Sequence, residues 1–84
     1  MPDAITPAVC KAARALAGLN QSELATAAKV GESTIHNFEV GRSVPNAKNM
    51  ADIIAALEKA GVEFIEENGG GPGVRLAKPK RGRK

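Results

Sequence analysis

The sequence contains no tryptophan or tyrosine, and only two phenylalanines, one cysteine and one histidine among its 84 residues. Proteins that bind single-stranded nucleic acids stack the bases on aromatic side chains, so the shortage of aromatic residues disfavours this function. A single cysteine, Cys10, excludes an intrachain disulfide and a CxxC metal pair. The sequence also offers no nucleophile–base arrangement, no phosphate loop and no metal-ligand spacing. We therefore expect neither an enzyme nor a bound cofactor or metal.

Long apolar runs are also missing. No stretch approaches the roughly 20 apolar residues that a membrane-spanning helix requires. The N-terminal stretch, MPDAITPAVCK, lacks the basic region and the long apolar run of a secretory signal. Together with the single cysteine, these absences predict a cytoplasmic, nucleoid-associated protein without membrane contact. A chain of this length has room for one small core, and oligomerisation commonly stabilises such domains.

The basic residues are concentrated at the C-terminus. Residues 78–84, KPKRGRK, hold five of the twelve basic residues and no acidic residue, which leaves a net charge of −2 on residues 1–77. A basic tail on a mildly acidic body indicates a polyanionic partner, although a solvated, disordered end would explain the charge equally well. Part of the tail resembles an AT-hook, but lysines stand where that motif has prolines. The tail residues expected to contact phosphate or the minor groove are Lys80, Arg81, Arg83 and Lys84.

Start and stop signals divide residues 1–61 into four short helices. Thr6 and Pro7 are typical of a helix start, and the alanine-rich run that follows ends at Gly18. A second helix begins at Asn20, with Glu23 completing a variant of the capping box. We expect it to end at Gly31. A third helix, ESTIHNFEV, and the turn GRSVPN then lead to a fourth, AKNMADIIAALEKAG. Helical spacing assigns to the core Cys10, Ala13, Ala17, Leu24, Ala28, Ile35, Phe38, Met50, Ile53, Ile54 and Leu57.

The hydrophobic period changes after Gly61. VEFIE and VRLA alternate apolar and polar residues, and a glycine-rich connection, ENGGGPG, separates them. This pattern predicts a β-hairpin over residues 62–77. An isolated two-stranded hairpin is marginally stable in water, so it should pack on the helices or pair with a second copy of itself.

The second and third helices, joined by a short turn at Val30 and Gly31, describe a helix-turn-helix. Here RALAGLNQSELA, followed by VGESTIHNFEVGRSVP, resembles a lambda-repressor-like, Cro/C1-type (XRE family) helix-turn-helix DNA-binding domain. With the fourth helix, the resemblance covers about two thirds of the chain, residues 5–60. It implies a mainly α, compact four-helix domain over residues 1–61. A β-hairpin extension over residues 62–77 and a basic tail over residues 78–84 follow that domain.

The resemblance also implies roles for individual residues. Gln21 matches a glutamine that touches phosphate and braces the recognition helix. Arg14 and Glu39 match a structural ion pair between the first and third helices. Arg42 is either a phosphate clamp, which the family pattern favours, or an ordinary surface charge. The residues expected to contact DNA are Gln21, Glu32, Ser33, His36, Asn37, Arg42, Lys48 and Asn49.

Four of these residues lie on the groove-facing side of the third helix. Asn37 is the best candidate base reader, because a carboxamide can bind N6 and N7 of adenine together. Ser33 can contact a base or a phosphate, and His36 is a polar residue facing solvent or DNA without a second metal ligand near it. Glu32 either accepts a hydrogen bond from cytosine, rejects wrong sequences, or only stabilises the helix N-terminus. The start of the fourth helix, with Lys48, can point its amides at a phosphate.

Two features depart from the family pattern. Gly31 stands where serine or threonine is usual, so the third helix should be frayed at its start or capped by Ser33. A hairpin replaces the fifth helix, and residues 62–77 could pair between two chains into a four-stranded sheet. The resemblance thus implies a transcriptional regulator, a repressor, that binds double-stranded DNA. The hairpin adds the expectation that it does so as a homodimer. An antitoxin with a toxin partner, or a protein-interaction module without DNA binding, is the alternative.

Overall fold

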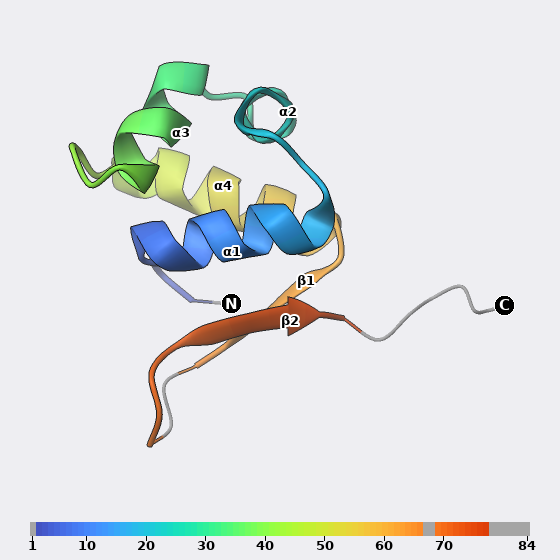
Figure 1. The fold of residues 1–84 in the computed structure, drawn as a ribbon. Coiled ribbons are helices and arrows are strands. Elements are labelled where there is room, and N and C mark those ends of the chain that lie inside the picture. Colours follow the sequence, from blue (N-terminus) through green and yellow to red (C-terminus); the bar gives the residue numbers. More distant parts are fainter. Residues whose placement is uncertain (1, 67–68, 78–84) are drawn as a thin grey trace, which may run out of the picture.

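The computed structural model of the protein describes residues 2–66 and 69–77. Within them it has four helices and one two-stranded antiparallel sheet, which confirms the predicted fold class (Figure 1). The four tail residues predicted to contact phosphate or the minor groove, Lys80, Arg81, Arg83 and Lys84, lie outside the described residues. The elements are α1 (Pro7–Ala17), α2 (Gln21–Ala28), α3 (Glu32–Glu39), α4 (Ala47–Lys59), β1 (Val62–Ile65) and β2 (Gly73–Leu76).

Three of the four helices begin with a side-chain cap. Thr6 Oγ1 accepts a hydrogen bond from the amide of Val9 at 3.1 Å. Asn20 opens α2 with a complete capping box, and Asn46 caps α4 by accepting from the amide of Asn49 at 2.8 Å. Each such cap satisfies an amide that the helix itself leaves unpaired. Gly31 is the N-cap of α3, and no side chain caps this helix, so of the two expectations for its start the capping by Ser33 is wrong.

Helices α1 and α2 end in the same backbone motif. Gly18 takes a left-handed conformation with φ 73°, and the next amide, that of Leu19, donates to the carbonyl of Arg14 at 3.0 Å. This is a Schellman motif, in which glycine is the usual left-handed residue. In α2 the left-handed residue is Lys29, with φ 60°, and Val30 N donates back to Ala25 O at 3.0 Å. The prediction that Gly31 ends α2 was therefore wrong.

A single core joins the helices to the hairpin. Leu24, Ile35, Ile53, Ile54 and Leu57 are completely buried, and the core continues into β1 through the buried Val62. Phe64 of β1 and Val74 of β2 lie opposite each other in the sheet and pack against the same core. All core residues predicted from helical spacing belong to this cluster, with Ala17 only partly buried at its edge.

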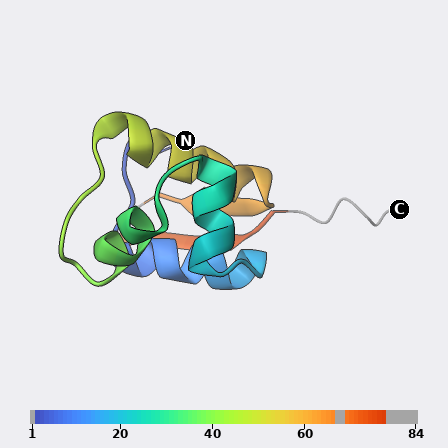
Figure 2. The same cartoon turned by 90° about the horizontal axis from the view of Figure 1, so that it is seen from above.

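Helices α1 and α4 form a central layer with other elements on both of its sides. Helices α2 and α3 lie on one side and the hairpin on the other, with β2 along α1 and β1 along α4 (Figure 1). Figure 2 views the molecule from the α2–α3 side, where these two helices lie in front of α1 and α4. The chain therefore presents α3 at the surface furthest from its sheet.

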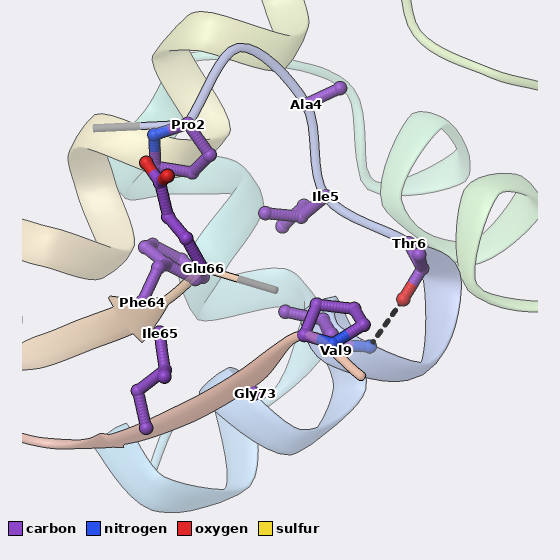
Figure 3. A pocket seen from close by; sticks show the side chains of 10 residues that line it. Pro2, Ala4, Ile5, Thr6, Val9, Phe64, Ile65, Glu66 and Gly73 are labelled. Atoms are coloured by element: carbon purple, nitrogen blue, oxygen red, sulfur yellow. Dashed lines mark hydrogen bonds between the residues drawn. The ribbon is translucent and has the colours of Figure 1, made fainter. Parts of the chain in front are cut away.

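A cavity of about 280 Å³ lies where the N-terminal segment meets the hairpin. In Figure 3, Ile5 and Val9 approach it from the N-terminal segment and α1, and Phe64 and Ile65 of β1, whose side chains leave the strand in opposite directions, also line it. Its lining is largely apolar, and it lies on the sheet side of the molecule, away from α3. The residues around it are Pro2, Ala4, Ile5, Thr6, Val9, Phe64, Ile65, Glu66, Pro72 and Gly73.

Candidate nucleic-acid interface

Helix α3 has one buried side and one exposed side. Ile35, Phe38 and Glu39 are buried, and they fix the orientation of the helix on α1 and α2. The opposite side carries Glu32, Ser33 and His36, which are exposed, and Asn37, which is half-buried. The structure thus brings the four residues predicted on the groove-facing side onto one solvent-facing surface.

Glu39, the last residue of α3, accepts hydrogen bonds from three other residues. Its Oε2 accepts from Arg14 Nε at 2.8 Å, and its Oε1 accepts from Arg14 Nη2 at 2.8 Å. Gln21 Nε2 donates to the same Oε1 at 3.0 Å, and the thiol of Cys10 donates to Oε2 at 3.3 Å. Because Arg14 and Cys10 come from α1 and Gln21 from α2, this carboxylate ties α3 to both neighbouring helices.

Burial and hydrogen bonding act in opposite directions on the ionisation of this carboxylate. Burial raises the pKa of Glu39, but the hydrogen bonds from Arg14, Gln21 and Cys10 together outweigh it and hold the pKa below its usual 4.5. Burial and the hydrogen bond to Glu39 raise the pKa of the Cys10 thiol to about 12. At neutral pH the cluster therefore contains an ionised carboxylate, a guanidinium and a neutral thiol.

Gln21 is the first residue of α2, and its position follows from the capping box of Asn20 and Glu23 just before and after it. One amide hydrogen of its side chain is used on Glu39. A carboxamide has a second amide hydrogen and an oxygen acceptor, so a phosphate can still be bound by the same side chain. The bracing contact is thus present in the structure, and the phosphate contact remains a prediction.

A third Schellman motif closes α3 and places Arg42. Gly41 is left-handed with φ 81°, its amide donates to Phe38 O at 3.0 Å, and Arg42 N donates to Asn37 O at 2.8 Å. The side chains of the same two residues also meet, because Arg42 Nη1 donates to Asn37 Oδ1 at 3.1 Å. Sequence reasoning missed this pairing, although Gly41, two residues after the last residue of the helix, was a signal that the chain folds back there.

The start of α4 uses its polar groups within the protein. Lys48 Nζ donates to Asp52 Oδ2 at 2.8 Å, one turn along the helix, and the amide of Asn49 is taken by Asn46. The spacing of four residues between Lys48 and Asp52 could have predicted this ion pair. Both of its side chains are exposed, so water and a nearby phosphate can compete for Lys48.

The structure describes residues 2–66 and 69–77. No group of three or more His, Cys, Asp or Glu side chains in these residues is placed to hold a metal ion. None of the helices in this part of the chain has the length and apolar character needed to cross a membrane.

Comparison with known families identifies the domain that these helices build. The family model HTH_3, described as helix-turn-helix, matches residues 11–64, which include all of α2, α3 and α4. The chain belongs to the Cro/C1-type (XRE) helix-turn-helix family. Membership in this family implies a DNA-binding protein, and the family is typically not enzymatic. A search of curated proteins gave no match.

Family membership gives the geometry its context. In this helix-turn-helix, α2 and α3 are the paired helices, and the buried side of α3 is fixed through Glu39. The matched residues include the ion pair of Arg14 and Glu39 and every residue of the exposed side of α3. The match also extends over most of β1, so the hairpin begins within the matched region.

Proposed function

We propose that the chain is a sequence-specific regulator of transcription that represses promoters by placing α3 in the major groove of double-stranded DNA. The observation that carries this proposal is the exposed side of α3, which bears polar side chains while the buried side is held by hydrogen bonds from three residues to Glu39. Sequence is read by donors and acceptors of the right geometry, and these residues need no net charge for it. In helix-turn-helix proteins the second helix of the pair has this role.

We propose that one set of residues reads the bases and that another binds phosphate and so positions the protein on the DNA. Ser33, His36 and Asn37 offer hydrogen-bonding groups to base edges, whereas Gln21 and Lys48 are proposed to bind phosphate. Glu32 stands in the first turn of α3, where a carboxylate is stabilised by the helix dipole and can reject unfavourable bases. Because residues 1–77 carry a net charge of −2, non-specific attraction to DNA from this part of the chain should be weak.

Selection of bound sites from a random pool of duplex DNA tests the proposal. We expect a short half-site, repeated at a spacing of about one helical turn or a multiple of it if two copies bind. Asn37→Ala should lower affinity for the selected site by about 1–3 kcal/mol and leave affinity for unrelated DNA unchanged. Lys11→Ala, on the exposed side of α1, is the matched control and should retain site preference. If the protein retains no DNA sequence from the pool at moderate salt, the result would instead support a protein-interaction module without DNA binding.

We propose that the regulator acts as a homodimer formed by β2. The amide of Ala77 donates to Gly61 O at 2.7 Å, which extends the ladder by one pair. Since hydrogen-bonded and non-hydrogen-bonded pairs alternate in antiparallel sheets, the backbone groups of Val74 and Leu76 point away from β1. Leu76 is also 55% exposed. Two β2 edges can pair about a two-fold axis into a four-stranded sheet, which would set the spacing of the two α3 helices.

Sedimentation of point variants tests the dimer better than truncation does, because removal of the hairpin would take Val62 out of the core. Leu76→Lys places a charge on the proposed pairing edge and should convert the dimer to monomer. Val44→Lys is the matched control, since Val44 is 75% exposed and lies in the turn between α3 and α4. Equal sedimentation of the two variants and the unaltered chain would contradict pairing through β2.

An antitoxin is the second candidate role. Ile65 and Leu76 leave apolar surface on the hairpin, which a toxin could cover in place of a second copy of the chain. The dimer experiment separates the two uses. A chain that remains monomeric at all concentrations, yet binds its selected DNA site, would leave the hairpin free for another protein.

A further inference from the structure

The C-terminal turn of α3 joins two residues that sequence reasoning treated separately. Arg42 is tied to Asn37 through its backbone, with Arg42 N donating to Asn37 O at 2.8 Å. It is tied a second time through its side chain, with Arg42 Nη1 donating to Asn37 Oδ1 at 3.1 Å. The left-handed Gly41 makes this return of the chain possible. The guanidinium is therefore held at α3, beside the proposed reading surface.

This contact changes what Asn37 can offer to a base. A free carboxamide presents one acceptor and a pair of donors, and this combination fits N6 and N7 of adenine. In the structure the acceptor Oδ1 is already used by Arg42. One lone pair of Oδ1 remains beside the bound guanidinium, but all the other polar groups left on the two side chains are N–H donors, because a guanidinium has no acceptor. Such a pair matches a ligand edge made of acceptors only.

In the major groove that edge belongs to guanine. Guanine presents N7 and O6, both acceptors, whereas adenine presents N7 beside a donating amino group. An arginine fork binds N7 and O6 together, and this is the commonest specific contact between proteins and DNA. Adenine would place its amino donor against the donors of Arg42, so the same pair should reject it.

We propose that Arg42 reads guanine in the major groove and that Asn37 is the residue that positions it. This inference rests on the proposed DNA-reading function and specifies one base of its site. Asn37 lies one helical turn after Ser33 on the exposed side of α3, which places the anchored guanidinium beside the residues proposed to read bases. A phosphate is also an acceptor-only ligand, so the experiment must distinguish the loss of base preference from a uniform loss of affinity.

Selection from a random duplex pool, applied to the unaltered chain and to variants, makes that distinction. The unaltered chain should select guanine at one position of each half-site, with roughly five- to 150-fold preference over other bases, the range of one good bidentate contact. Arg42→Ala frees Asn37 Oδ1, so selection at that position should change from guanine to adenine. Lys59→Ala removes one positive charge at the far end of α4 and should leave the selected base unchanged.

Two substitutions of Asn37 test its positioning role. Asn37→Asp keeps an acceptor for Arg42 and should retain the guanine preference, while its added negative charge lowers affinity for all DNA. Asn37→Ala removes the acceptor for Arg42 and should weaken the preference for guanine. Unlike Arg42→Ala, this variant should not select adenine, because it has no carboxamide. Far-ultraviolet circular dichroism before and after DNA binding establishes that each variant has its helices.

The failures of the two proposals are distinguishable. If Arg42→Ala weakens binding to every sequence alike and the selected base stays the same, Arg42 contacts phosphate and the inference is overturned, while sequence-specific reading stands. Selection of adenine by the unaltered chain, retained in Arg42→Ala, overturns the inference in the same way. If the unaltered chain selects no sequence, the proposed function fails, and the assignment of Arg42 fails with it.

Discussion

Arg14→Ala would remove the charged partner of a carboxylate that is almost inaccessible to solvent. The side chain of Glu39 is 1% exposed, and Arg14 supplies two of its hydrogen bonds, both at 2.8 Å. The variant leaves Glu39 with only Gln21 and Cys10 as donors. Removing one partner of a buried ion pair costs about 3–5 kcal/mol. A domain of this size has a free energy of unfolding of about 4–13 kcal/mol, so the loss should be about a quarter of it or more.

The pH dependence of the variant should also change sign. In the unaltered protein the pKa of Glu39 is lowered, so its contribution to stability is complete above the unfolded value of 4.5 and is lost as the pH falls through the folded value. Without Arg14, burial should raise the pKa of Glu39 above its unfolded value. The folded variant then favours the protonated carboxyl, and its stability should increase as the pH falls from about 7 to about 5.

Urea unfolding followed by far-ultraviolet circular dichroism measures both effects, since the chain has no tryptophan or tyrosine for fluorescence. The double variant Arg14→Met with Glu39→Leu is the control, because it removes both charges and should recover most of the loss. A loss below about 1 kcal/mol in Arg14→Ala would refute the reasoning, since exposed ion pairs contribute no more than this. If Arg14→Ala lowers the free energy of unfolding equally at about pH 7 and about pH 5, the unpaired charge does not reside on Glu39 and this assignment is refuted.

Three further predictions concern caps and burial. Lys29→Gly should raise the free energy of unfolding by about 1 kcal/mol in thermal or urea unfolding, because glycine adopts the left-handed conformation without strain; Lys29→Ala should give no such gain. Asn20→Ala should cost about 1 kcal/mol by removing the capping box of α2, whereas Asn20→Asp should be nearly neutral in the same measurement. The Cys10 thiol, with its pKa raised to about 12 by burial and by Glu39, should react with iodoacetamide only when the protein unfolds, so fast labelling in the native state at neutral pH would contradict its burial.

Helix starts and the core could be predicted from the sequence because both depend on local patterns. Asn20 followed by Glu23, and Thr6 followed by Pro7, have short-range meanings that the structure confirms. The end of α2 could not be predicted in the same way. Lys29 takes the left-handed position although a glycine, Gly31, which would adopt it without strain, stands only two residues later, so the local pattern points to the wrong residue.

The candidate site was only partly predictable, since its contacts join residues distant in the sequence. The relation of Arg14 to Glu39 came from family resemblance, and nothing in the sequence indicated that the Cys10 thiol donates to the same carboxylate. Helical spacing predicts Asn37 on the side of α3 opposite Ile35 and Phe38, and in the structure it is half-buried there. Helical spacing says nothing about where a side chain beyond the end of the helix lies. The hydrogen bond from Arg42 to Asn37 Oδ1 could therefore be found only in the structure.

The contact of α1 with β2 has a consequence for how the protein folds. These two elements are separated along the chain by α2, α3, α4 and β1, yet they lie against each other in the structure. Closing such a long loop costs more entropy than forming the short-range contacts of α2 with α3, so β2 should dock late. Substitutions in β2 should then accelerate unfolding and leave the refolding rate nearly unchanged. The lifetime of the folded state would thus depend on a strand whose main helical neighbour is α1.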